Sequence, residues 1–179
     1  MIPVKEKQKK AFVDLKSALQ IKNVMAIPRI EKVVVSVGIG SVKDKNKIEI
    51  IQDRLRKITG QQSVGRVAKK SIASFKLREG QTIGYQITLR GARMYDFLDR
   101  LFNIALPRTR DFRGVNRSSV DSMGNLTIGI KEHIIFPETA DEEARDVFGL
   151  AVTVVTTAKN KKDAEIYLEY IGVPFKKAK

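Results

Sequence analysis

Residues 31–39 of the chain read EKVVVSVGI, and their alternation is the clearest structural signal in the sequence. One set of alternating positions is apolar and the other is small or polar: Val33, Val35, Val37 and Ile39 against Lys32, Val34, Ser36 and Gly38. Because successive side chains of a strand point to opposite faces, this segment predicts a β-strand with one buried face and one open face.

Residues 81–90, QTIGYQITLR, repeat this division. Their apolar set is Ile83, Tyr85, Ile87 and Leu89, and their other set is Thr82, Gly84, Gln86, Thr88 and Arg90. If helices cover the apolar side, the sheet presents an open face of uncharged hydrogen-bonding groups. Such a face can approach RNA 2′-hydroxyls and base edges, with arginines at its border for phosphates. The alternative is an ordinary solvated face, which usually carries more lysine and glutamate than this one.

The rest of the chain supplies helices and further strands. Apolar residues recur at intervals of three and four positions in residues 5–19, 47–59, 92–105 and 162–171, which predicts helices. Gly60 stands where a helix C-cap is expected. Strands are predicted at 63–68 and 150–157, and a hairpin at 120–130 that turns at Gly124-Asn125. Strands and helices alternate unevenly along the chain, which favours an α+β fold over a regular βαβ series. We expect a single domain over residues 1–179.

The composition is that of a basic globular protein. Of its 179 residues 42% are hydrophobic, which is enough for a core and excludes wholesale disorder. The absence of cysteine excludes a disulfide scaffold, thiolate catalysis and cysteine-ligated zinc. One histidine, His133, is too few for a histidine-based metal site. No apolar run approaches the ~20 residues of a membrane span, and no signal-peptide pattern follows Met1, so we expect a soluble intracellular protein.

The net charge of +14 predicts polyanionic partners. Basic residues gather in residues 1–22, 66–80 and 90–117, and those of the last zone are all arginines. The planar guanidinium suits phosphate forks and base stacking better than an ammonium does. Residues 138–149 are acidic and fit a basic protein. For any single zone, a solvated surface is the alternative.

Motifs for catalysis or cofactors are weak. Gly38-Ile39-Gly40 follows a strand, but position 43 is Lys43, so the dinucleotide fingerprint fails, and no P-loop is present. His133 has no triad partners near it in sequence, which favours a packed or hydrogen-bonded residue. The carboxylates of residues 138–143 lack EF-hand spacing. We therefore expect neither an enzyme nor a cofactor.

Residues 69–80, KKSIASFKLREG, form a basic loop around an aromatic ring. Such a loop can hold a phosphate backbone while Phe75 stacks on a ribose or base. The alternative is that Phe75 anchors the loop to the core.

The sequence resembles a known family, the large-subunit ribosomal proteins of family five, which bind 5S rRNA. The resemblance rests on ordered blocks from residue 24 to the C-terminus. These are Val24-Met25, Ile27 to Lys32, Gly38 to Gly40, Thr59 to Gln61, Lys70 to Ala73, Phe75 to Arg78 with Gly80, Thr88 to Gly91, Leu106 to Arg108, Arg110 to Gly114, Gly124-Asn125, Ile134 to Glu138 and Thr156 to Lys159. Two positions depart from the family: it commonly has asparagine at Ser36 and often a basic residue at Val67.

The resemblance implies a curved, mainly antiparallel sheet with helices on one face, and no catalytic activity. It implies a cytoplasmic, ribosome-bound protein of the central protuberance that attaches 5S rRNA, touches 23S rRNA and lies among neighbouring large-subunit proteins. The loop is similar to the one that reaches the P-site tRNA, and the acidic stretch to the side that bridges to a basic protein of the small-subunit head.

The candidate site residues fall into four groups. For rRNA we expect Arg29, Ser36, Gly38, Gln61, Thr88, Arg90, Gly91 and Arg93. For tRNA we expect a mobile loop with Lys70, Ser71, Ser74, Phe75, Lys76 and Arg78. Arg108, Arg110 and Arg113 form a second basic loop, and Glu138, Asp141, Glu142 and Glu143 are the candidates for the intersubunit contact.

Two other function classes stay open at this level. A basic DNA-binding architectural protein shares the charge argument, but no helix shows a base-reading face beside a basic patch. An RNA-modifying enzyme would need a cofactor pocket or an acid–base pair, and the sequence displays neither.

Overall fold

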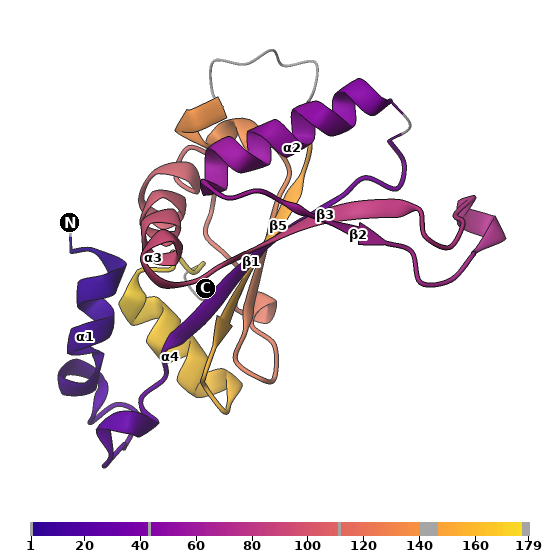
Figure 1. Cartoon of the computed structure of the whole chain (residues 1–179). Helices are drawn as coiled ribbons and strands as arrows, with labels where there is room; N and C mark the ends of the chain where they lie inside the picture. The colour runs from indigo at the N-terminus through magenta and orange to yellow at the C-terminus, as the bar shows by residue number, and fades with distance from the viewer. Residues whose placement is uncertain (1, 43, 111, 140–146, 177–179) are drawn as a thin grey trace.

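A computed structural model describes residues 2–42, 44–110, 112–139 and 147–176. Figure 1 shows one sheet with helices gathered on one side and a long hairpin that projects away from them. The described helices are α1 (Val4–Leu15), α2 (Lys45–Thr59), α3 (Gly91–Arg100) and α4 (Lys161–Ile171). The strands are β1 (Ile30–Gly38), β2 (Val64–Val67), β3 (Thr82–Leu89), β4 (Leu126–Ile130) and β5 (Leu150–Thr156).

The sheet has the strand order β2-β3-β1-β5-β4, and every neighbouring pair is antiparallel. The segment with the strongest alternation, β1, is therefore the central strand. Val35 of β1 lies opposite Ile87 of β3 and Val152 of β5, so three apolar side chains meet on one face. The α+β fold predicted from the sequence is confirmed.

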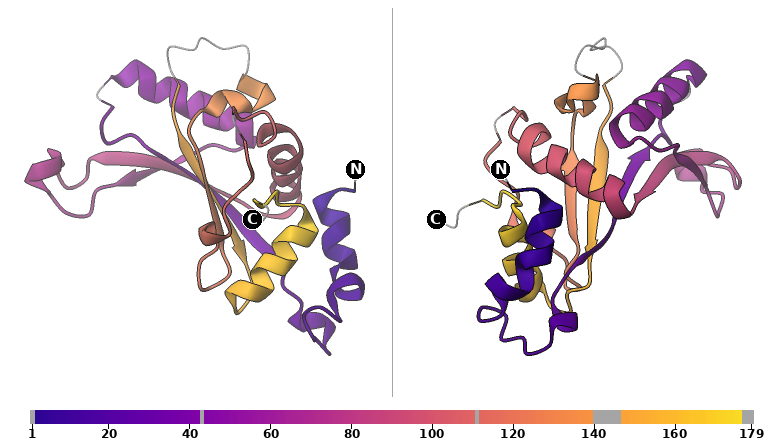
Figure 2. Two further views of the ribbon diagram at one scale, coloured as in Figure 1. Left: turned by 180° about the vertical axis from the view of Figure 1, so that it is seen from behind. Right: turned by 60° about the vertical axis from the view of Figure 1, so that its left-hand side comes forward.

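The apolar face of the sheet packs against the helices in one continuous core. Val33, Val35 and Val37 are almost fully buried, together with apolar residues of all four helices, such as Ala11, Ile58, Phe97 and Leu168. Figure 2 shows α1 on the outside of the helical layer, next to α3 and α4. The sheet's other face keeps its side chains half-buried or exposed along β1, β3 and β5, apart from Gly84 of β3. Helices therefore bury one side of this layer and leave the other open.

Local signals explain where α2 begins and ends. The Asp44 side chain accepts a hydrogen bond from the Asn46 N–H (3.0 Å), as an N-cap does. Gly60 takes the left-handed conformation (φ 67°) that a C-cap requires, as the sequence predicts.

Three predicted elements differ from the structure. The first helix ends at Leu15 instead of residue 19, and the segment predicted at 92–105 ends in a π-helical turn from Leu101 to Ala105. The 120–130 hairpin is wrong: Val120 and Leu126 form a single bridge, and β4 pairs with β5 instead. The turn at Gly124-Asn125 does form, because the Asp121 carboxylate accepts the Asn125 N–H (2.7 Å), but the residues before it do not become a strand.

Candidate nucleic-acid interface

Two rows of uncharged side chains cross the open face of the sheet. The register places Val64, Gln86, Ser36, Ala151 and Gly129 in one row, and Thr88, Val34, Thr153 and Thr127 in the next. The Thr127 and Thr153 hydroxyls lie 3.1 Å apart. These rows present hydroxyl and amide groups but no charge, so RNA can approach the backbone closely without an unpaired charge being buried.

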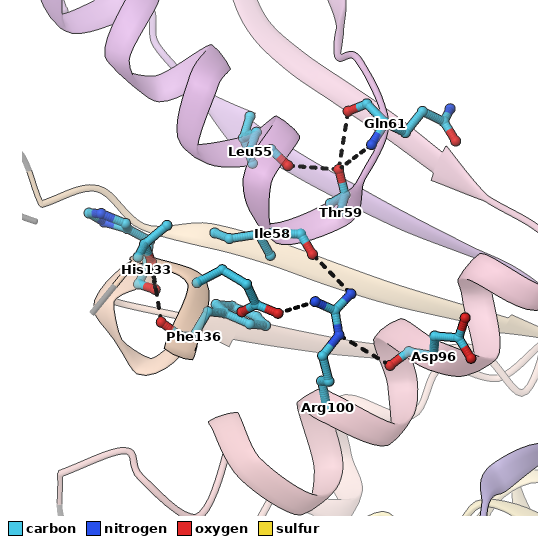
Figure 3. Close-up of polar contacts among 10 residues, drawn as sticks. Leu55, Ile58, Thr59, Gln61, Asp96, Arg100, His133 and Phe136 are labelled. Carbon is cyan, nitrogen blue, oxygen red and sulfur yellow. Dashed lines mark hydrogen bonds and ion pairs between the residues drawn. The ribbon is translucent and has the colours of Figure 1, made fainter. Parts of the chain in front are cut away.

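Two polar side chains border these rows at the β2–β3 end. The Gln61 amide lies 3.4 Å from the carbonyl oxygen of Thr88, which brings the end of α2 beside the sheet (Figure 3 shows Gln61 next to Thr59). The Arg66 Nε donates to the Gln86 side-chain oxygen (2.6 Å). The Gln86 oxygen is thus engaged, and its NH₂ group stays available as a donor to RNA.

Two of the predicted rRNA residues with guanidinium groups flank the sheet, Arg29 before β1 and Arg90 after β3, and the third, Arg93, lies in the first turn of α3. Arg29, Arg90 and Arg93 all have exposed side chains. The backbone of Arg29 is fixed to Thr157 by two hydrogen bonds of 3.0 Å, so its side chain projects from a rigid position. Arg90 pairs with Glu31 (3.3 Å), and both side chains are about half exposed. These guanidinium groups are therefore available to phosphates, although that of Arg90 is also paired with the Glu31 carboxylate.

The glycines predicted for this site differ in the space around them. A Cβ at Gly38 would meet nothing within 4 Å, and Gly91 has a φ of 62° at the start of α3. At Gly84, directly opposite Gly38, a Cβ would lie 2.7 Å from the carbonyl oxygen of Val37. Gly84 is needed for the pairing of β1 with β3, whereas Gly38 leaves an open approach to the backbone.

The loop of residues 69–80 lies at the tip of the β2–β3 hairpin, far from the helices (Figure 1). All six residues predicted for the tRNA contact are exposed: Lys70, Ser71, Ser74, Phe75, Lys76 and Arg78. Phe75 is 70% exposed, so the alternative that it anchors the loop to the core is wrong. A bridge between Ile72 and Leu77 shapes the tip, and Lys76 takes a left-handed conformation (φ 52°).

The second basic loop borders a cavity. Arg108, Arg110 and Arg113 are exposed and line a hollow of about 810 Å³ beside β4. Its apolar lining includes Ile128 and Ile135. Gly129, the last residue of the first row, also lines this hollow, so the cationic rim adjoins the β4 edge of the sheet, where that row ends.

The acidic candidates divide into one described residue and three that lie outside the described residues. Asp141, Glu142 and Glu143 are the latter. Glu138 is ion-paired with Arg100, whose guanidinium also donates to the carbonyl oxygens of Ile58 (3.2 Å) and Asp96 (3.4 Å; Figure 3). The ion pair joins α3 to the short turn Pro137–Thr139, and the bond to Ile58 joins α3 to the end of α2. Glu138 therefore has an internal partner that the sequence did not predict.

His133 is fully buried, and its contacts confirm the prediction of a packed or hydrogen-bonded residue. Its Nε2 lies 3.2 Å from the Arg54 guanidinium, and its ring stacks on Phe148 with centroids 4.2 Å apart. Arg54 is only 5% exposed and lies among the buried apolar residues of α2. Sequence reasoning missed it because a charged side chain is expected on the solvent side of a helix.

Sequence reasoning also missed the contributions of β4 and β5 to the open face. Thr127, Thr153 and Ala151 join the rows only through strand pairing. The one sequence signal for them is the alternation within residues 150–156, where Ala151, Thr153 and Val155 face away from the core.

Within the described part of the chain, no group of three or more His, Asp or Glu side chains is placed to hold a metal ion. None of the described helices is long and apolar enough to span a bilayer.

Comparisons with known proteins match nearly the whole chain. The family model for ribosomal protein L5 matches residues 23–78, and the model for the C-terminus of the same ribosomal family matches residues 82–175. The large ribosomal subunit protein uL5 of Ureaplasma parvum serovar 3 is 50% identical, over 95% of this chain and 93% of its own length. The protein of the same name from Trichlorobacter lovleyi is 49% identical (94% and 95%), and that from a Thermoanaerobacter species is 46% identical (99% and 100%).

Proposed function

The chain belongs to the ribosomal protein L5 family, and we propose that it binds 5S rRNA through the open face of its sheet. As a family member it is a structural constituent of the large ribosomal subunit and acts in the cytoplasm, bound to the ribosome. It is not an enzyme.

The single observation that supports this function is the pair of uncharged rows across the sheet, with guanidinium groups at their border. Phosphate contacts fix the position of a protein on a nucleic acid, whereas neutral donors and acceptors read riboses and base edges. Arg29, Arg90 and Arg93 supply the first kind of contact, and Ser36, Thr88 and Gln61 the second. Gly38 and Gly91 allow the RNA backbone to come close.

The remaining partners are assigned to surfaces outside these rows. The exposed loop of residues 69–80 contacts the P-site tRNA, because its cations and Phe75 project from the hairpin tip. The arginines of the second basic loop face 23S rRNA or neighbouring large-subunit proteins in the central protuberance. The acidic stretch meets a basic protein of the small-subunit head through Asp141, Glu142 and Glu143, since Glu138 is engaged by Arg100.

The experiment is a filter-binding titration of 5S rRNA against two matched variants. Ser36→Asp places a carboxylate in the middle of the first row, where it repels phosphates and loses its own hydration. Ser122→Asp makes the same change at an exposed turn outside the rows. We expect Ser36→Asp to weaken binding about tenfold or more, which is ~1.4 kcal/mol, and Ser122→Asp to leave it within about twofold.

Competition separates this function from that of a DNA-binding architectural protein. Duplex DNA added at matched salt should displace 5S rRNA poorly, since the proposed face reads 2′-hydroxyls. Equal competition by both nucleic acids, or equal affinity of the two aspartate variants, would contradict the proposal.

A further inference from the structure

The N-terminal helix carries a basic surface that the proposed function does not use. At 3.6 residues per turn, Lys5, Lys9, Phe12 and Lys16 fall on one face of α1, within a sector of about 60°. Lys16 extends the helix by one residue in helical conformation (φ −53°, ψ −45°). We call Lys5, Lys9 and Lys16 the lysine stripe; at 1.5 Å per residue it is about 16 Å long.

The lysine stripe is exposed and has no acidic partner among the described residues. All three lysines are exposed, and no described carboxylate forms an ion pair with any of them. The Lys16 ammonium lies 5.7 Å from the centroid of the Phe12 ring, which keeps it on this face. These charges are therefore available to an external anion.

One of the two acidic residues of α1, Asp14, is engaged by a neighbouring helix. The Tyr170 hydroxyl of α4 donates to the Asp14 carboxylate (2.5 Å). Burial and the contact with Asp14 raise the pKa of Tyr170 to about 12, so the hydroxyl stays protonated and keeps donating. The negative charge of Asp14 is thus held toward α4, away from the lysine stripe.

Several contacts hold α1 rigidly on the helical layer. The Val4 N–H donates to Asp99 (2.9 Å), and the Lys7 ammonium donates to the carbonyl oxygen of Ile171 (2.9 Å). The Tyr167 hydroxyl donates to Gln8 (3.2 Å), and Ala11 and Leu15 are buried in the core. A fixed helix loses little conformational entropy on binding, so its cations form a ready contact.

The position of α1 separates it from the other proposed RNA contacts. Figures 1 and 2 show α1 and the tip of the β2–β3 hairpin at opposite ends of the molecule. The helix also lies on the side of α3 and α4 away from the sheet. An RNA held on the open sheet face leaves α1 uncovered.

We propose that the lysine stripe of α1 binds the phosphate backbone of a second RNA helix while the sheet holds the first. The inference rests on the proposed function, because it takes 5S rRNA as the occupant of the sheet. Phosphate is the fitting ligand, since three exposed ammonium groups in a row give charge complementarity without base-reading groups. The protein then holds two RNA segments at once, one on the open face of the sheet and one on α1 at the outside of the helical layer.

The test measures a ternary complex by fluorescence anisotropy. The full chain is saturated with unlabelled 5S rRNA, and a labelled short RNA duplex of arbitrary sequence is then titrated. The triple variant Lys5→Gln, Lys9→Gln and Lys16→Gln removes the charge but keeps helix propensity, because glutamine and lysine are similar helix formers. We expect the triple variant to weaken duplex binding about tenfold or more. The slope of the logarithm of the binding constant against the logarithm of the salt concentration should fall in magnitude by about two to three, because three phosphates are no longer neutralised.

A matched control changes three lysines elsewhere. Lys159→Gln, Lys161→Gln and Lys162→Gln alter the net charge equally at the start of α4, and we expect a duplex affinity within about threefold of wild type. An equal loss in both triple variants, or no loss in the α1 variant, would overturn the inference. The double variant Lys5→Gln, Lys9→Gln keeps the contact between Lys16 and Phe12 and should show a smaller loss, which covers the case that the triple variant folds poorly.

The first titration step distinguishes the two proposals. If wild-type protein fails to bind 5S rRNA, the proposed function is wrong. If 5S rRNA binds normally to all variants and the lysine-stripe variants bind the duplex as tightly as wild type, only the further inference is wrong.

Discussion

Arg90 is the residue at which the protein's own contacts and the proposed RNA contacts compete. Its guanidinium lies 3.3 Å from Glu31, and the side chains are 57% and 47% exposed. Ion pairs this exposed contribute only about 0–1 kcal/mol in water. A phosphate can therefore take the guanidinium from Glu31 at small cost.

At this scale we predict that Arg90→Ala weakens 5S rRNA binding by ~1–3 kcal/mol, the usual effect of removing a charge-assisted hydrogen bond from an interface. The control Glu31→Gln removes the competing carboxylate and should leave the affinity unchanged or slightly higher. Both are measured by filter binding at one salt concentration. Unchanged affinity of the Arg90 variant would remove this residue from the site.

Among the elements, the β2–β3 hairpin is the one that separates two proposed activities. Its strands contribute Val64, Gln86 and Thr88 to the uncharged rows, while its tip carries the exposed cations. The tip has few contacts with the core, since all residues of 69–80 except Leu77 are exposed. Substitutions at the tip should therefore change binding without changing the free energy of unfolding.

We predict that replacing Lys76 and Arg78 together by alanine weakens tRNA binding and spares 5S rRNA binding. The reason is that each cation at the tip can neutralise a phosphate only of the RNA that reaches the tip. Each affinity is measured separately with labelled tRNA and labelled 5S rRNA. An equal loss of both would show that the loop belongs to the rRNA interface.

For the whole molecule, charge and shape divide the surface into regions with different partners. The chain has a net charge of +14, and exposed basic residues lie at the sheet border, the hairpin tip, the second basic loop and α1, while the two central rows carry no charged side chain. Long-range attraction to RNA thus comes from the periphery, and close fit comes from the middle.

The salt dependence of 5S rRNA binding tests this division. If about six phosphates are neutralised, raising the salt from about 50 to about 200 mM should lower the affinity by roughly three orders of magnitude, or somewhat less. The measurement is a series of titrations at increasing potassium chloride. An affinity that does not change with salt would contradict a border of phosphate contacts.

Much of the fold follows from local patterns that the sequence carries directly. The alternation in residues 31–39 predicts the central strand, and Gly60 marks the end of α2, because strand and helix periods and left-handed caps depend on neighbouring residues. The exposed loop of residues 69–80 and the buried His133 were also predictable, the first from its lack of a period and the second from the absence of partners nearby in the sequence.

Only the tertiary structure decided which distant segments meet. The pairing of β5 with both β1 and β4 brings Thr153 and Thr127 into the open face. The turn Pro137–Thr139 packs against α2 and pairs Glu138 with Arg100 of α3. Such contacts depend on packing between residues far apart in the chain, and no local period records them. The alternation of apolar and polar residues within a strand could therefore be predicted from the sequence, but the surface that the paired strands form together could not.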